Sequence, residues 1–329
     1  MPAKRCQQPL RNAHLRQRLP IASLILERRL INPAARARLL ASWSTLNAST
    51  EAQFSRALPS PSALSAAAEA ASGVLCVVPY LANHGHLAGA LRSIAEQSTH
   101  PGRVVVALDN SDEVDSASVE ANLEAAGRSL SEAGIAWGVK RFRGLNGPYR
   151  MLNQIVENSR DSRHIWLHDS DDHSHPSRLQ KQLAFLERHR LDICSCFELR
   201  LRPTALELID YPLQVSRALN HEPGHCMLWP GSLIRRTLWH RLQGCSDQHR
   251  FGADTEFQLR ACFIARMANY PSYLYARRIH SRSLTGSPDT GHGSWQRGYL
   301  NSLYKADYYL RQLRRQAGEP TTLEPRFRD

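Results

Sequence analysis

The residues with the clearest chemical potential form a short acidic turn, His168-Asp169-Ser170-Asp171-Asp172-His173-Ser174-His175-Pro176. Within it, Asp169, Asp171 and Asp172 crowd three carboxylates together. Like charges this close repel each other, and placing them beside an apolar core costs free energy. A divalent cation relieves both penalties, and hard carboxylate oxygens suit Mg²⁺ or Mn²⁺. The turn therefore predicts a metal site that holds a diphosphate.

Strands and helices that alternate along the chain are needed to position this turn. Apolar runs at 74–78, 104–108, 135–139 and 165–167 are typical of buried strands, and apolar residues at helical spacing separate them. This alternation predicts βαβ units and a mostly parallel sheet. Ligands bind such sheets at the carboxyl ends of the strands, where Pro79, Tyr80, Asp109 and the acidic turn follow. The first strand is not followed by a Gly-x-Gly-x-x-Gly turn, and no P-loop is present.

Composition limits the class of protein. The 329 residues carry a net charge of +12, which favours an anionic partner. Zinc-finger spacing and RNA-binding signatures are absent from the sequence, so we expect no nucleic-acid partner. No apolar run is long enough for a membrane span, and the basic N-terminus lacks an apolar core, so we expect no signal peptide. Scattered cysteines without a Cys-x-x-Cys pair indicate a cytoplasmic protein with reduced thiols.

The chain divides into three compositional zones. Residues 1–72 are rich in arginine and predict a basic helical extension, with a linker at Pro59-Ser60-Pro61-Ser62. The extension is either a membrane-surface helix or a helical cap on the main domain, and we expect the cap. Residues 73–285 form the α/β domain, and 286–329 a helical segment. The helix from Tyr299 to Arg315 is compatible with a homodimer contact or with packing on the core, and both stay open.

From Val74 to Thr285 the chain resembles the family 2 glycosyltransferases, which have the GT-A fold. The resemblance rests on the order and spacing of several motifs: Val77-Val78-Pro79-Tyr80 with Asn83; Leu91-Arg92-Ser93-Ile94 with Gln97-Ser98; Asp109-Asn110-Ser111; Asn146-Gly147-Pro148 with Asn153; the turn from Leu167 to Leu179; Gly231-Ser232-Leu233-Ile234-Arg235-Arg236; and Gly252-Ala253-Asp254-Thr255-Glu256-Phe257. It implies a GT-A nucleotide-diphospho-sugar transferase domain, a Rossmann-like mixed sheet flanked by helices. Asn110 and Ala253 depart from the family pattern, which usually has acidic residues there.

The resemblance implies an inverting, metal-dependent transferase. It would move one sugar from a UDP, dTDP or GDP donor to the hydroxyl of a carbohydrate, lipid-linked or protein acceptor. The processive Gln-x-x-Arg-Trp motif is missing, so we expect single-sugar transfer in cell-surface polysaccharide or glycolipid synthesis. The basic N-terminal zone would suit peripheral contact with an anionic membrane at its inner face.

The same resemblance assigns residue roles. Asp171 would bind Mn²⁺ or Mg²⁺ with Asp169, which also lies near the donor ribose, and with His280 as a third ligand. Asp254 would be the general base, and we expect burial to raise its pKa. Further residues would contact the nucleotide sugar: Pro79 and Tyr80 at the base, Asn83, Asp109 through a nucleobase N–H, and Asn153. Arg277, Arg278 and Arg282 are candidates for contacts with diphosphate oxygens, and surface arginines without such a role are the alternative.

Each assignment has an alternative. Asp172 and Asp254 each precede a predicted helix, so either carboxylate could instead be an N-cap. His221, His225 and Trp229 are candidates for a wall facing the acceptor, although core packing explains Trp229 equally well. For the whole protein, the alternatives are a metal-dependent phosphoesterase and a non-catalytic nucleotide-binding protein with a degenerate GT-A fold.

Overall fold

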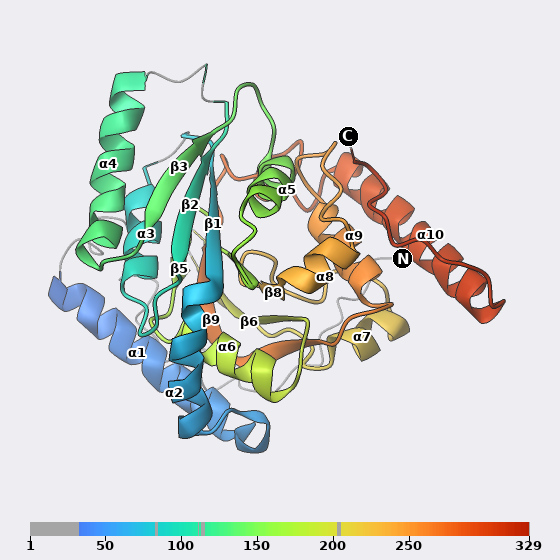
Figure 1. Ribbon diagram of the computed structural model, residues 1–329, viewed down its shortest axis with the longest axis horizontal. Coiled ribbons are helices and arrows are strands. Elements are labelled where there is room, and N and C mark those ends of the chain that lie inside the picture. Colours follow the sequence, from blue (N-terminus) through green and yellow to red (C-terminus); the bar gives the residue numbers. More distant parts are fainter. Residues whose placement is uncertain (1–32, 83–84, 111, 113–115, 203–204, 329) are drawn as a thin grey trace.

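A computed structural model describes residues 33–82, 85–110, 112, 116–202 and 205–328 (Figure 1). Its centre is a nine-stranded mixed sheet in which eight strands follow the order β3-β2-β1-β4-β8-β6-β9-β5. Figure 1 shows the strands between two groups of helices, with α3 and α4 on one side and α5, α8 and α9 on the other.

The first half of the sheet is parallel, as the alternating pattern predicts. It contains β1 (Val74–Tyr80), β2 (Arg103–Leu108), β3 (Trp137–Arg141) and β4 (His164–Leu167). The third strand starts later than residue 135. Ile135 donates its amide to Leu130 O at 2.9 Å and closes the turn through Gly134, which has φ +69°. Only after this turn does the chain become extended, at Trp137.

The second half of the sheet is mixed in direction. β8 (Leu233–Arg235) is antiparallel to β4 and to β6 (Ile193–Leu201), and β6 is parallel to β9 (Met267–Arg278). β5 (His173–Ser174) pairs with β9, and β7 (Leu206–Ile209) pairs with β6, both antiparallel. The β5–β9 pairing brings the end of the acidic turn beside the last residues of β9.

Apolar cores cover both faces of the sheet because strand side chains alternate between the faces. On one face, Cys76 and Val78 of β1 pack with α3 (Leu87–Ala95), α4 (Ser116–Glu132) and α6 (Arg178–Arg188). On the other, Leu75 and Val77 lie in a cluster with residues of α5 (Pro148–Asn158), α7 (Val215–His221), α8 (Arg236–Arg241), α9 (Ala253–Ala261) and α10 (Trp295–Gln316). β1 is therefore buried on both sides, as its continuous apolar run predicts.

The N-terminal helix α1 (Pro33–Ala52) packs against β6 and β9. Trp43 and Leu46 are buried there, and Asn47 Oδ1 accepts the Tyr273 amide at 2.9 Å. Residues 33–52 thus pack on the domain, as the helical-cap interpretation predicts. The apolar pattern behind the basic amphipathic helices consists of Leu24, Leu26, Leu30, Ile31, Leu39 and Leu40. Its first four residues lie outside the described residues, and Leu39 and Leu40 pack toward the core.

The expected linker is wrong in one respect. Residues after Ser60 form α2 (Pro61–Ala70), flanked by short 3₁₀ helices at Ser55–Ala57 and Ala71–Gly73. Ser60 caps the helix by accepting the Ala63 amide at 3.3 Å, and Pro61 suits the first helical position because it needs no hydrogen-bond acceptor there. A capping serine, a proline at the first helical position and the alanines that follow therefore favour a helix here, although Pro and Ser are also common in linkers.

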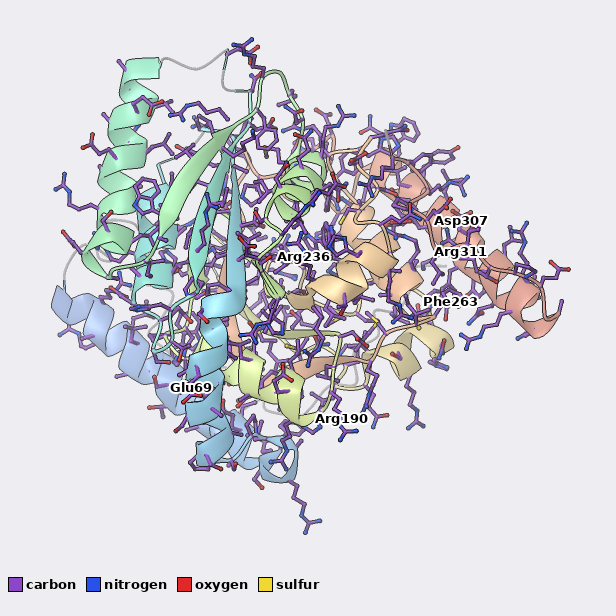
Figure 2. All side chains as sticks on the ribbon, viewed as in Figure 1. Glu69, Arg190, Arg236, Phe263, Asp307 and Arg311 are labelled. Atoms are coloured by element: carbon purple, nitrogen blue, oxygen red, sulfur yellow. The ribbon has the colours of Figure 1, made fainter. Side chains whose placement is uncertain are left out.

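α10 packs back on the core. Leu300, Tyr304 and Tyr308 are buried beside the cluster that contains α9. Among the described helices, none combines the length and the apolar character that crossing a bilayer requires. Side chains of α10 such as Asp307 and Arg311 are labelled in Figure 2, beside Phe263.

Candidate functional site

A cavity of about 290 Å³ lies where β1, β2 and β4 end. Its lining contains most of the residues assigned from the sequence: Pro79, Tyr80, Asp109, Asp169, Asp171, Asp254 and His280. They come from strand ends, from the acidic turn, from the first turn of α9 and from the segment after β9. The parallel arrangement of the strands therefore gathers distant motifs at one edge of the sheet.

The acidic turn forms a compact cluster of oxygens. Asp169, Asp171 and Asp172 each offer a carboxylate oxygen, and these atoms lie within 4.8 Å of one another. His280 Nε2 is 2.8 Å from Asp171 Oδ2, so the predicted third ligand stands beside the predicted first one. Asp172 Oδ1 accepts the Arg278 amide at 2.7 Å, whereas its Oδ2 is buried without a hydrogen-bond partner.

Burial makes this cluster electrostatically demanding. It raises the pKa of Asp169 to about 7, and the charge of Asp171 adds to the increase, while Arg277 opposes it. Burial, together with the Asp171 and Asp169 charges, raises the pKa of Asp172 well above its ordinary value. Both raised pKa values indicate that the surrounding protein does not supply enough positive charge to stabilise the ionised carboxylates.

A divalent cation fits these residues. Three clustered carboxylates provide hard oxygen ligands, and the buried Asp172 Oδ2 lacks the hydrogen bond that such an atom normally makes. The imidazole of His280 would complete a mixed oxygen and nitrogen set suited to Mn²⁺.

A buried arginine at the start of α6 holds the acidic turn in place. Arg178, at the start of α6, donates Nη2 to Leu167 O at 2.6 Å and Nη1 to Ser174 Oγ at 2.7 Å. Its guanidinium lies 4.3 Å from the ring centroid of Trp166, on β4. Because these contacts tie both ends of the turn to one side chain, the carboxylates are fixed relative to the sheet.

Asp172 does not cap the following helix. α6 begins at Arg178, and the residue before it, Ser177, occupies the N-cap position. After Asp172 the chain first forms β5, which pairs with β9, so the helix starts only at Arg178. The N-cap interpretation of Asp172 is therefore wrong.

Asp109 lies at the end of β2 and is almost fully buried. Its Oδ1 accepts the Asn146 amide at 2.8 Å and the Asn110 amide at 3.1 Å, and its Oδ2 accepts the Gly147 amide at 2.8 Å. The carboxylate thus holds the loop before α5 against the sheet, while it also lines the cavity. Gly147 adopts φ +81°, a conformation that favours glycine.

The sequence also assigned Asn83 and Asn153 to the nucleotide sugar. Asn83 lies outside the described residues. Asn153 is not part of the cavity lining. It is buried in α5, where its amide donates to Cys245 O and Asp247 Oδ2 and accepts the Cys245 amide. The structure therefore gives Asn153 a role in holding the segment before α9.

Asp254 faces the cavity from the first turn of α9. The N-cap of this helix is Gly252, so the N-cap interpretation of Asp254 is wrong. Its carboxylate is 3.5 Å from His225 Nδ1 through Oδ2, and its Oδ1 is buried without a hydrogen-bond partner. The side chain keeps 16% of its surface exposed, so the carboxylate reaches the cavity.

The expected increase in the pKa of Asp254 is also wrong. Burial does act to raise the pKa, but His225 and Arg297, with hydrogen bonds from the Thr255 amide and the Tyr149 side chain, outweigh it. The pKa of Asp254 is therefore lower than its ordinary value. The opposing side chains come from distant elements, which the local sequence could not reveal.

Arginine and histidine side chains dominate the rest of the lining. Arg277, Arg278 and Arg282 are all present, as predicted for a diphosphate site. Arg277 forms an ion pair with Glu198, in which Nη1 lies 3.9 Å from Oε1. Arg277 Nη2 also donates a hydrogen bond to Thr285 Oγ1 at 2.6 Å. His225 and Trp229 also line the cavity, but His221 does not.

Sequence reasoning missed a wall of the cavity formed by Tyr149, Arg250, His292, Arg297 and Asn301. Arg297, on α10, is held by the carbonyls of Thr290 and Leu284 and lies over the Phe251 ring. Tyr149 directly follows the Asn-Gly-Pro motif, and this proximity is the one signal that pointed to it. Arg250, His292 and Arg297 lie in stretches without a recognisable pattern, and Asn301 lies in the expected C-terminal helix, whose pattern gave no sign of a site.

Comparison with known proteins agrees with this architecture. Residues 71–321 match the family described as "Glycosyltransferase like family 2". No curated protein matches the chain in sequence.

Among solved structures, residues 1–349 of S. aureus TarS in complex with UDP-GlcNAc are similar, with a TM-score of 0.52 and 14% identity. The match covers 71% of this chain and 65% of that one, so the chain spans less than two thirds of the TarS fragment. A mannosyltransferase from Pyrobaculum calidifontis, in complex with GDP-Man and Mn²⁺, has a TM-score of 0.48 and 14% identity over 76% of this chain and 65% of its own. By its sequence match over most of its length and its mixed, helix-flanked sheet, the chain belongs to glycosyltransferase-like family 2 and has the GT-A fold.

Proposed function

We propose that this protein is an inverting, metal-dependent glycosyltransferase. It transfers one sugar from a UDP, dTDP or GDP donor to a hydroxyl of a carbohydrate, lipid-linked or protein acceptor in the cytoplasm. The observation that carries the proposal is the placement of Asp254 in the same cavity as the acidic turn. Proton acceptance and diphosphate binding are the two requirements of such a transfer.

The cavity residues divide the work into donor binding and proton transfer. Pro79, Tyr80 and Asp109 would line the space for the nucleoside, and the acidic turn follows the end of β4. Asp169, Asp171 and His280 would hold Mn²⁺ or Mg²⁺, which supplies Lewis-acid neutralisation of the diphosphate. Arg277, Arg278 and Arg282, which line the cavity at and after the end of β9, add positive charge beside the acidic turn.

The Asp254 carboxylate accepts the proton of the acceptor hydroxyl. The hydroxyl oxygen then forms a bond to the anomeric carbon as the bond to the diphosphate breaks. Attack from the face opposite to the leaving group inverts the configuration. His225 and Arg297 keep Asp254 ionised before this step, because they hold its pKa below the ordinary value.

The wider setting follows from the charge of the chain. A net charge of +12 suits an anionic surface or substrate, which is consistent with synthesis of a cell-surface polysaccharide or glycolipid at the inner face of a membrane.

Donor turnover tests the proposal. The full chain is incubated with UDP-, dTDP- and GDP-sugars, with and without Mn²⁺, and released nucleoside diphosphate is measured. We expect Mn²⁺-dependent release with one donor class. Asp254→Asn should retain nucleotide binding but lose turnover by ~10²–10⁴-fold, and Asp171→Asn should lose the Mn²⁺-dependent part of binding.

Asp161→Asn, at an exposed surface position, is the matched control and should behave as the unaltered protein. Nucleotide binding without any dependence on Mn²⁺, and without turnover, would instead favour a non-catalytic binder. Release of phosphate from simple phosphomonoesters would favour a phosphoesterase.

A further inference from the structure

Helix α10 has apolar side chains on two opposite sides. Leu300, Tyr304 and Tyr308 are buried against the core. On the other side, large apolar side chains are exposed to solvent: Trp295 by 75%, Tyr299 by 58%, Tyr309 by 51%, Leu310 by 47% and Leu313 by 62%. Isolated exposed apolar residues are common, but these five are most of the large ones exposed in the described chain and they share one helix.

The exposed residues follow the spacing of a helix-packing seam. Successive steps of four and three residues connect the stripe, which consists of Trp295, Tyr299, Ser302, Ala306, Tyr309 and Leu313. Over these five steps the spacing averages about 3.6 residues per turn, the repeat of a straight α-helix, so the stripe runs along one side of α10. All six stripe residues are exposed, and α10 projects at the edge of the molecule in Figure 1.

The stripe is symmetric about its middle. If two copies of α10 lie antiparallel and cross near Tyr304, Trp295 of each copy meets Leu313 of the other, and Tyr299 meets Tyr309. We propose that this stripe is the contact between two copies of this chain, which form a dimer with twofold symmetry. A twofold contact requires one surface to complement itself, and the order of the stripe meets that requirement.

The exposed apolar area is sufficient for such a contact. The exposed fractions of the four large stripe side chains, Trp295, Tyr299, Tyr309 and Leu313, together equal about two and a half whole side chains, or ~500 Å² per copy at ~200 Å² for each. Two copies would then bury ~1,000 Å² in total, which is near the smallest area of a specific protein interface. The stripe therefore predicts a dimer of low affinity.

The centre of the stripe favours a second helix over a bilayer. There Ser302 of each copy would meet Ala306 of the other, and these small side chains allow two helices to approach closely where they cross. The Ser302 hydroxyl donates to Gly298 O at 3.0 Å, so close approach leaves no hydroxyl proton unpaired. Membrane binding instead grows with the apolar area that enters the lipid, and two small residues in mid-face would weaken it.

Dimer formation would also support the cavity. Arg297 and Asn301 belong to α10 and line the cavity, while Trp295 and Tyr299 lie in the stripe on the same helical turns. The second copy would therefore brace the helix that forms this wall. The proposal itself rests on α10 alone and is independent of the reaction.

The mass of the full chain in solution, measured by sedimentation equilibrium, tests the contact. We expect a dimer at micromolar concentration. Tyr299→Glu and Leu313→Glu should each raise the dissociation constant at least tenfold, whereas Arg314→Ala, at an exposed position off the stripe, should not. Because all three side chains are exposed, unchanged melting temperatures would separate loss of the contact from loss of folding.

Disulfide cross-linking tests the antiparallel register. Mixing Trp295→Cys protein with Leu313→Cys protein should give a cross-linked dimer on mild oxidation. Trp295→Cys protein alone should not, because an antiparallel pair separates those two positions by ~27 Å. A monomer at every concentration, a dimer that survives both glutamate substitutions, or a cross-link of Trp295→Cys with itself would overturn the proposal. Co-sedimentation of the monomer with phosphatidylglycerol vesicles, abolished by Tyr299→Glu, would assign the stripe to a membrane instead.

Discussion

His225 Nδ1 lies 3.5 Å from Asp254 Oδ2, so a side chain of the segment before β8 stands directly against the carboxylate at the start of α9. Burial lowers the pKa of His225, although the charge of Asp254 opposes this. Arg297 is a second cation that lowers the pKa of Asp254. The two neighbours of the proposed base, His225 and Arg297, therefore come from different parts of the chain.

Arg297 should control the acid limb of the pH–rate profile. Activity needs ionised Asp254 and is lost as the pH falls through its pKa, which lies below the ordinary value of 3.8. Arg297→Gln removes a charge that lowers this pKa, so the pKa rises and the acid limb moves to higher pH. The measurement is kcat/KM for donor turnover across the acidic range.

Arg297→Lys is the matched control, since it keeps the charge while it loses the planar contacts to the Thr290 and Leu284 carbonyls. Its acid limb should stay near that of the unaltered protein. Equal shifts in the two variants would mean that local structure, rather than charge, sets the pKa of Asp254.

Asp109→Ala should weaken both the fold and nucleotide binding. The substitution leaves the Asn146 and Gly147 amides without their acceptor, and each buried unpaired group costs about 1–3 kcal/mol. Asp109→Asn should cost less, because one oxygen remains to accept. Urea unfolding gives the free energies, and titration with UDP, dTDP and GDP gives the affinities. A full-strength fold with lost binding in Asp109→Ala would show that Asp109 acts only on the ligand.

His280→Gln should lower the affinity for Mn²⁺ at least tenfold, or about 1.4 kcal/mol, in the presence of the nucleoside diphosphate. The reason is its position, 2.8 Å from Asp171 Oδ2. Mn²⁺ binding can be followed by electron paramagnetic resonance. His221→Gln, which alters an exposed histidine outside the cavity, should leave the affinity unchanged. An equal affinity in both variants would remove His280 from the ligand set.

The sequence predicts the parts of this site that depend on local patterns. Continuous apolar runs identify β1, β2 and β4, and strand ends then locate Asp109 and the acidic turn. Patterns fail where a residue's environment is made by distant segments. The lowered pKa of Asp254 depends on Arg297, on the last helix. Asn153 belongs to a motif with a predicted ligand role, yet its bonds go to Cys245 and Asp247.

Trp43→Ala should destabilise the protein by about 3–5 kcal/mol, because it empties a buried aromatic site on β9. The indole also donates a hydrogen bond to Tyr273 O, which is left unpaired in the variant. Thermal and urea unfolding measure the loss. Trp295→Ala provides the comparison for a largely exposed tryptophan and should change monomer stability little. Equal stability of Trp43→Ala would mean that α1 rests on the domain without supporting it.

The packing of α1 on β9 has a consequence for how the family region is delimited. The family match begins at residue 71, after both α1 and α2, yet Asn47 of α1 bonds the backbone of the strand that carries Arg277 and Arg278. The packing of this domain therefore extends beyond the residues that match the family. A truncation at residue 71 would expose the side of β6 and β9 that α1 covers.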